Sequence, residues 1–155
     1  MFGLPFDPAH IAPYWEIPIE RIQEQVSNCR NLVEFVEQFY GEFARKQGKP
    51  RWADKTPNNV RAIPQILSWF PNARFIHVVR DGRDVVCSLR NHPTERIENG
   101  RIVPVRTVNP ISRCSERWLR DTSAGRAFCG HPRCLEVRYE RLVSEPATEV
   151  RRGGE

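Results

Sequence analysis

The sequence predicts an α/β fold in which helices flank a parallel sheet, and two observations lead to this prediction. Segments with apolar residues at helical spacing alternate with short segments of strand length, in the order helix–strand–helix–strand–helix–strand–helix. One of the short segments, residues 75–79, is a compact apolar and β-branched run, which is typical of a buried parallel strand.

The N-terminal third is expected to hold an irregular lead-in and one amphipathic helix. Residues 1–18 contain four prolines, which disfavour regular structure. From Asn31 onward, apolar residues recur at i, i+3, i+4 and i+7 and form one face of a helix, which Gly48 and Pro50 should end. This stripe indicates packing in the core.

A short segment over residues 51–54 is the first candidate strand, and a second helix follows it. Thr56 is expected to cap this helix through its hydroxyl, with Pro57 in the first helical position. The apolar stripe continues to Phe70, and Pro64 within it should kink the helix or delay its start.

In the second half of the chain, the strand over residues 75–79 ends abruptly at Arg80, and helical spacing resumes at Val85. Residues 91–110 combine proline, glycine and several charges, and are expected to form a loop. The remaining elements are expected to be a helix over 111–128, a strand over 134–139 and a final helix from Pro146.

Length and composition exclude several classes of protein. The 155 residues, 39% of them hydrophobic, suffice for one packed domain and argue against disorder. No run of 18 apolar residues could span a membrane, and the start lacks the pattern of a secretory signal, so a cytoplasmic location is expected. Five cysteines are an odd number, which favours reduced thiols over a disulfide framework.

The charge balance suits an anionic ligand but does not identify one. The chain carries 24 Lys and Arg against 19 Asp and Glu, for a net charge of +5. Arginine, which binds phosphate and carboxylate bidentately, supplies most of the basic residues. Because these residues are scattered along the chain, nucleic acid is not expected as a partner.

Two strand-to-helix junctions each carry a cation. Lys55 immediately precedes one predicted helix, and Arg80 ends a predicted strand just before another. Ligands of parallel sheets bind at the carboxyl ends of the strands, where helix N-termini attract anions. The two junctions therefore suggest a polyanionic ligand that spans them, with the hydroxyl of Ser88 facing the same cleft as Arg80. The alternative is that Arg80 and Asp81 simply form a pair on the surface.

The residues around Arg80 resemble a known family. The segment FPNARFIHVVRDGRDVVCS, residues 70–88, resembles the 3′-phosphate-binding segment of sulfotransferases that use 3′-phosphoadenylyl sulfate (PAPS). The branch it most resembles contains tyrosylprotein sulfotransferases and many bacterial relatives. Three further pieces agree in order and spacing, and the resemblance covers about residues 48–152. These pieces are Asp54–Pro57, Cys114 with Trp118, and Val137–Val143 with Pro146.

The resemblance implies a P-loop-NTPase-like fold and transfer of a sulfuryl group from PAPS, as co-substrate, to a hydroxyl of a carbohydrate, peptide tyrosine or small molecule. Arg80 and Ser88 match the pair that binds the 3′-phosphate, and Tyr139 matches a tyrosine that contacts the cofactor. Lys55 matches the catalytic lysine that stabilises the sulfuryl group in the transition state. By analogy with phosphoryl transfer, a fixed ammonium can do this without a metal.

The sequence also departs from the family pattern. The loop that holds the 5′-phosphosulfate, and the first strand that bears it, are absent and are expected upstream of Met1. The general base should then be missing too, and Glu16 and Glu20 are its nearest candidates. The chain also stops at Glu155, before further cofactor-covering loops. Residues 1–155 are therefore expected to be a single partial sulfotransferase domain, truncated at both ends and inactive alone.

Several other features are expected to be structural. The segment 129–134 has a C-x-H-x-x-C pattern but supplies only three ligands, so no zinc site is expected. His77 is expected to be a packed core histidine.

Where some relatives carry another phosphate-binding arginine this chain has His92, and Arg90 is the nearest substitute. The residues expected inside are Trp69, Ile111, Cys114, Trp118 and Leu119, and those expected on a solvated face are Arg113, Arg117 and Arg120.

Two other functions remain open from the sequence. One is a non-catalytic remnant that binds a nucleotide resembling adenosine 3′,5′-bisphosphate without turnover. The other is a basic module for nucleic acid or protein, which would bind DNA or RNA with a steep dependence on salt.

Overall fold

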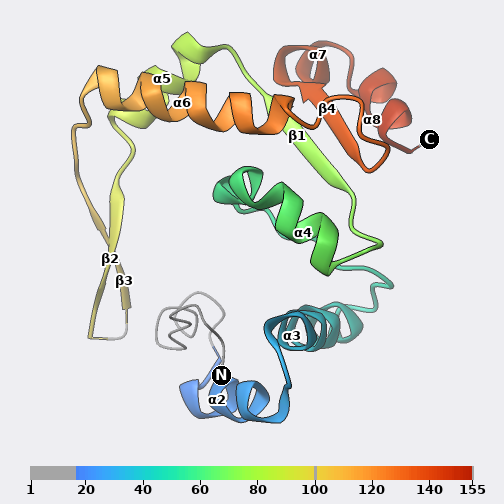
Figure 1. Ribbon diagram of the computed structural model, residues 1–155. Coiled ribbons are helices and arrows are strands. Elements are labelled where there is room, and N and C mark those ends of the chain that lie inside the picture. The colour runs from blue at the N-terminus through green and yellow to red at the C-terminus, as the bar shows by residue number, and fades with distance from the viewer. Residues whose placement is uncertain (1–16, 100, 155) are drawn as a thin grey trace. The chain divides into compact units, whose positions relative to one another are not determined.

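The computed structural model describes residues 17–99 and 101–154 (Figure 1). The irregular lead-in expected over residues 1–18 therefore lies almost wholly outside the described residues. In the part that is described, no helix is both long and apolar enough to cross a membrane.

The described residues form two compact units. The first contains the chain up to Lys55 together with Thr94–Val105. The second contains Thr56–Pro93 and the chain from Arg106 onward. Each unit has its own hydrophobic core.

Two helices pack together in the first unit. α2 spans Ile19–Asn28, where no element was expected, and α3 spans Leu32–Lys46, which confirms the predicted amphipathic helix. Asn31 caps α3 because its side chain accepts a hydrogen bond from the backbone N–H of Glu34 (2.9 Å). The buried core of this unit consists of Ile22, Phe35 and Phe39.

The segment over residues 51–54 is not a strand, contrary to expectation. Its Trp52 stacks on Tyr40 of α3, with ring centroids 4.8 Å apart. The indole N–H of Trp52 also donates to Glu37 over 3.4 Å. An aromatic side chain thus holds this segment against α3, and no backbone ladder does so among the described residues.

A β-hairpin occupies part of the stretch 91–110, which was expected to be a loop. β2 (Thr94–Glu98) pairs antiparallel with β3 (Arg101–Val105). The sequence between them is Asn99–Gly100, a dipeptide typical of two-residue hairpin turns, and Asn99 has the positive φ, 51°, that such turns require. The loop prediction was wrong because it rested on the prolines and charges of this stretch, whereas the Asn–Gly dipeptide favours a hairpin.

A two-stranded parallel sheet organises the second unit and confirms the predicted α/β class (Figure 1). β1 spans Phe75–Val79 and β4 spans Cys134–Arg138. The strands end in register, with Val79 opposite Arg138. Their carboxyl ends therefore lie at the same edge of the sheet, where Arg80 follows β1 and Tyr139 follows β4.

Helices cover one face of this sheet. The single helix expected over residues 57–71 is instead a 3-10 helix, η1 (Pro57–Ala62), followed by α4 (Ile63–Trp69). Pro64 lies in the first turn of α4, which confirms that it delays the start of the α-helix. α6 spans Ile111–Arg126. The core between these elements and the sheet consists of Val60, Ile63 and Leu67, with Phe75, Ala124, Phe128 and Cys134 packed against them.

α6 lies close to β1 because Gly125 has no side chain. A Cβ atom at Gly125 would overlap the imidazole ring of His77. The His77 side chain is only 12% exposed, as expected for a packed histidine, and burial lowers its pKa. Arg61 of η1 adds a bidentate pair with Asp121 of α6, at 2.7 and 2.9 Å.

The other face of β1 is open to solvent. Ile76 is 61% exposed and Val78 is 51% exposed, so the strand that was expected to be buried is covered on one face alone. In α6, Cys114 is buried as expected. The residues that were expected inside but are exposed are Trp69, Ile111 and Leu119.

Two helices follow β4. α7 (Tyr139–Ser144) was not expected, whereas α8 (Pro146–Gly154) confirms the predicted final helix. Glu149 joins them: its side chain is 1% exposed and lies 3.2 Å from Arg141 and 2.9 Å from Arg152. Two arginines thus compensate the charge of Glu149, which is buried between these helices.

Candidate cofactor-binding site

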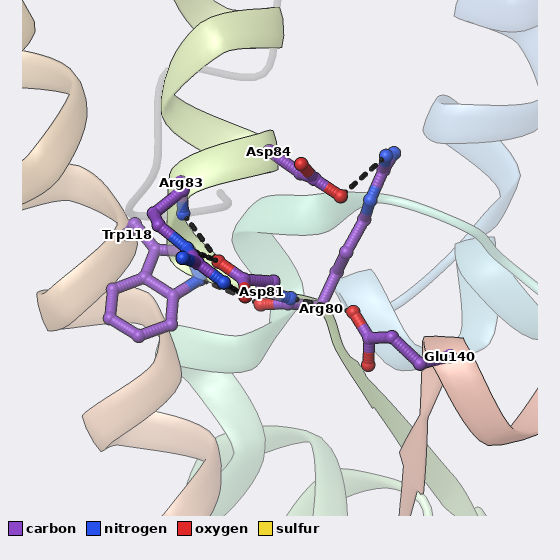
Figure 2. Close-up of polar contacts among 6 residues, drawn as sticks. All are labelled: Arg80, Asp81, Arg83, Asp84, Trp118 and Glu140. Carbon is purple, nitrogen blue, oxygen red and sulfur yellow. Dashed lines mark hydrogen bonds and ion pairs between the residues drawn. The ribbon is translucent and has the colours of Figure 1, made fainter.

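The candidate site begins where β1 passes into α5 (Gly82–Arg90) (Figure 2). The Asp81 carboxylate caps α5 by accepting a hydrogen bond from the backbone N–H of Arg83 at 2.9 Å. It also accepts a hydrogen bond from the Arg83 guanidinium at 2.7 Å. These bonds lower the pKa of Asp81 from 3.8 to about 2. Asp81 therefore occupies the N-terminus of α5, which was expected to offer free N–H groups to an anion.

Arg80 is held in a different way. Its guanidinium lies 3.1 Å from the Asp84 carboxylate and 4.7 Å above the centre of the Tyr139 ring. The alternative reading, a surface pair between Arg80 and Asp81, is not what forms, because Asp81 pairs with Arg83. The Arg80 side chain remains 42% exposed, so a ligand can reach its guanidinium.

Ser88 lies on α5 one helical turn beyond Asp84, and both side chains are exposed. Residues four apart lie on the same face of a helix. The Asp84 pair therefore draws the Arg80 guanidinium toward the face of α5 that carries Ser88. Of the predicted cofactor residues, the structure brings Arg80 and Tyr139 into contact and places Ser88 on the adjoining helix face.

The peptide group between Arg80 and Asp81 is held at both ends (Figure 2). Its carbonyl, on Arg80, accepts a hydrogen bond from the indole N–H of Trp118 at 3.2 Å. Its N–H, on Asp81, donates to the Glu140 carboxylate at 2.8 Å. Trp118 was expected to be a core anchor, and it is half-buried at this junction. A Cβ at Gly82 would lie 3.0 Å from its ring.

Sequence reasoning missed the site roles of Trp118, Asp84 and Glu140. Glu140 could have been found, because it directly follows Tyr139 at the end of a strand parallel to β1. Asp84 could have been found from its i, i+4 spacing to Arg80 and Ser88. Nothing in the sequence indicated the Trp118 bond, which depends on how α6 crosses the end of β1.

Lys55, the predicted catalytic residue, ends the first unit and is exposed. The helix after it is the six-residue η1, and Thr56 makes no cap hydrogen bond through its side chain, contrary to expectation. The geometry around Arg80 belongs to the second unit and does not include Lys55.

None of the contacts described above involves the remaining candidates. Glu20 is exposed in the first turn of α2, and Glu16 lies outside the described residues. Arg90 is exposed in the last turn of α5, and His92 is exposed just beyond it. The arginines expected on a solvated face, Arg113, Arg117 and Arg120, are exposed.

The cysteine–histidine segment forms a turn. His131 Nδ1 accepts the backbone N–H of Arg133 at 3.2 Å. The Arg133 guanidinium in turn donates to the carbonyls of Leu67 and Pro71 at the end of α4, at 3.0 and 2.7 Å. Within the described ranges, no group of three or more His, Cys, Asp or Glu residues could hold a metal ion.

Comparison with known proteins identifies the family. The sequence model described as "Sulfotransferase family" matches residues 10–152, so the chain belongs to the sulfotransferase family. Within that family it resembles the tyrosylprotein-sulfotransferase branch.

Curated relatives support this placement. The chain is 28% identical over 137 residues to the protein-tyrosine sulfotransferase of Drosophila melanogaster, a match that covers 85% of this chain and 26% of the relative. It is 33% identical over 123 residues to a putative protein-tyrosine sulfotransferase of Caenorhabditis elegans, which covers 76% of this chain and 44% of the relative. The chain thus spans less than half the length of these relatives. No solved structure matches it significantly.

Proposed function

We propose that this chain binds the nucleotide end of PAPS and belongs to an enzyme that transfers the sulfuryl group of PAPS to a hydroxyl acceptor. The observation that carries the proposal is the placement of Arg80. Its half-exposed guanidinium stands at the carboxyl end of β1, over the ring of Tyr139, which directly follows the neighbouring parallel strand β4. Ligands of parallel sheets bind at this edge.

In this proposal the 3′-phosphate of PAPS replaces Asp84 on the Arg80 guanidinium. A planar guanidinium can donate two parallel hydrogen bonds to a phosphate, and Ser88 adds a neutral hydroxyl donor from the same face of α5. The Tyr139 ring supports the guanidinium from its other side, through the contact at 4.7 Å. The family membership supports these roles for all three residues.

In the transfer step, the bond between sulfur and the 5′-phosphate oxygen of PAPS breaks, and a bond forms from sulfur to the acceptor oxygen. The acceptor hydroxyl gives its proton to a general base of the enzyme, and adenosine 3′,5′-bisphosphate leaves with the bridging oxygen. We assign to Lys55 the stabilisation of charge on the transferring group, because a fixed ammonium is suited to that task. We propose the P-loop-like fold of the family as the framework of the whole enzyme.

The acceptor is proposed at the level of its reacting group, a hydroxyl. The relatives are named for protein tyrosine, which supports a peptide tyrosine among the classes of acceptor. Acceptor loops vary on a fixed scaffold, so the name of a relative at 28% identity does not transfer the acceptor by itself.

Substitution of Arg80 tests the proposal. Arg80→Ala should weaken binding of adenosine 3′,5′-bisphosphate about ten- to a hundredfold, because it removes charge-assisted hydrogen bonds to the 3′-phosphate. Isothermal titration calorimetry would measure the affinity. Two matched cation deletions serve as controls. Arg117→Ala removes an exposed arginine that lies 3.7 Å from Asp121 and should have little effect.

Lys55→Ala, the second control, should change this affinity less than Arg80→Ala does, because the bisphosphate lacks the sulfuryl group that Lys55 is proposed to contact. Equal losses from Arg80→Ala and Arg117→Ala would contradict the assignment of the 3′-phosphate to Arg80.

A further inference from the structure

We propose that Trp118 and Glu140 are positioning residues that clamp the Arg80–Asp81 peptide group and thereby set how strongly the site selects a 3′-phosphate. The inference rests on the proposed function, since it concerns the phosphate that Arg80 would bind. Neither residue touches the proposed ligand in this account. They act through the backbone that carries the Arg80 side chain.

The peptide group between Arg80 and Asp81 needs partners from outside its own elements. It follows the last residue of β1 and precedes the first residue of α5, so neither the strand ladder nor the helix satisfies both of its polar groups. Trp118 of α6 binds its carbonyl at 3.2 Å, and Glu140 of α7 binds its N–H at 2.8 Å. Figure 2 shows the two side chains approaching from opposite sides.

The clamp also fixes the junction that follows β1 to the junction that follows β4. Glu140 directly follows Tyr139, whose ring lies under the Arg80 guanidinium at 4.7 Å. The hydrogen bond from the Asp81 N–H to Glu140 therefore holds the backbone of Tyr139 next to the backbone of Arg80. A long arginine side chain loses much rotamer freedom when it binds a ligand. Because the Arg80 backbone and the Tyr139 ring are already fixed, the entropy lost on ordering the Arg80 side chain is smaller.

The same geometry explains why Gly82 follows Asp81. A Cβ at Gly82 would lie 3.0 to 3.1 Å from three atoms of the Trp118 ring, which is tighter than ordinary contact. The indole thus reaches the Arg80 carbonyl over a residue without a side chain, and a Cβ there would require the ring to shift by a few tenths of an ångström. The ring and its N–H have separable roles, packing on Gly82 and binding the carbonyl.

Two substitutions at Glu140 separate the hydrogen bond from the charge. Glu140→Gln and Glu140→Ala remove the same negative charge, but only the glutamine keeps an oxygen that can accept the Asp81 N–H. Trp118→Phe keeps an aromatic ring over Gly82 and removes only the indole N–H. Glu116→Ala, which deletes an exposed acid elsewhere on α6, controls for a general change in charge.

The measured quantity is the ratio of two dissociation constants for the full 155-residue chain, that of adenosine 5′-monophosphate over that of adenosine 3′,5′-bisphosphate. Glu140→Ala should lower this ratio roughly three- to tenfold relative to Glu140→Gln, the effect of about one net hydrogen bond. Trp118→Phe should lower it in the same direction. Glu140→Gln and Glu116→Ala should keep at least the wild-type ratio.

A purely structural role would weaken both nucleotides equally and leave the ratio unchanged, and that result would overturn the clamp. If Glu140→Ala does not unfold cooperatively, Trp118→Phe decides the question by itself. A wild-type chain that binds both nucleotides equally would overturn the proposed 3′-phosphate site, and the clamp with it. Wild-type selectivity that survives in both Glu140→Ala and Trp118→Phe would overturn the clamp alone.

Discussion

At the scale of single residues, the peptide group after Arg80 is fixed by two hydrogen bonds, whereas the Arg80 side chain makes only weak contacts. Its pair with Asp84 is an exposed ion pair at 3.1 Å, and such pairs contribute about 0.2–1 kcal/mol. Charge-assisted hydrogen bonds contribute about 1.5–3 kcal/mol. A phosphate should therefore displace Asp84 from the guanidinium, while the backbone of Arg80 stays in place.

Asp81 gives a prediction about pH. Its bonds to Arg83 lower its pKa from 3.8 to about 2, so the folded protein favours the ionised carboxylate. A depressed pKa contributes stability that is fully present above the unfolded value, and that is lost as the pH falls through the folded value. The wild type should be more stable than Asp81→Asn above about pH 4, and this difference should vanish between pH 4 and pH 2.

Urea unfolding at a series of pH values would measure this difference. The same comparison in an Arg83→Gln background is the control, because the Arg83 side chain is the largest cause of the shift. In that background, Asp81→Asn should change the free energy of unfolding by a smaller amount. A difference that stays constant from pH 6 to pH 2 would contradict this account of the α5 cap.

At the scale of elements, Gly125 sets the distance between α6 and β1. In an open helix, Gly→Ala stabilises by about 1 kcal/mol. At Gly125 the new Cβ would overlap the His77 ring, and overpacking costs about 1–3 kcal/mol. The steric cost should exceed the helix gain, so Gly125→Ala should lower the free energy of unfolding, as measured by urea denaturation.

Two comparisons isolate the cause. Gly41→Ala in α3 is the matched control, because its Cβ would have no neighbour closer than the mobile end of Arg45 at 3.4 Å, and it should be neutral or stabilising. The second comparison is Gly125→Ala in a His77→Ala background, where the loss should disappear. Destabilisation that persists without the His77 ring would show that the overlap is not its cause.

Elements with strong local signals were predictable from the sequence. The run 75–79 became β1 with the same bounds, and the stripe after Asn31 became α3. Pro146 starts α8 as predicted. These features depend on periodicity, capping and proline geometry, which act within a few residues along the chain.

Features that depend on tertiary contacts were not predictable. Trp52 stacks on the Tyr40 ring of α3 in a segment that was expected to be a strand. The position of Trp118 over Gly82, and its bond to Arg80, follow from how α6 crosses the end of β1. Local propensity is a weak prior for such contacts, which join residues far apart in the sequence.

At the scale of the whole molecule, the three residues assigned to the nucleotide all come from the second unit. The contact between Arg80 and Tyr139, and the helix face that carries Ser88, form within it. Binding of the 3′-phosphate therefore depends on contacts inside one unit, and the proposal does not require Lys55 for it.

The net charge of +5 does not by itself make the chain a nucleic-acid binder. Several arginines lie against acids of their own unit, as Arg61 does with Asp121 and Arg83 with Asp81. These pairs reduce the positive charge that is available to a phosphate backbone. Selective binding of a small nucleotide and general binding of polyanions are therefore separable by experiment.

The most direct test of the central claim is calorimetric titration of the 155-residue chain with adenosine 3′,5′-bisphosphate and with adenosine 5′-monophosphate. The two ligands differ only in the 3′-phosphate. If Arg80, Ser88 and Tyr139 form its site, the bisphosphate should bind at least about tenfold more tightly, the effect of one charge-assisted hydrogen bond. Equal affinities, together with steeply salt-dependent binding to DNA or RNA, would contradict the account.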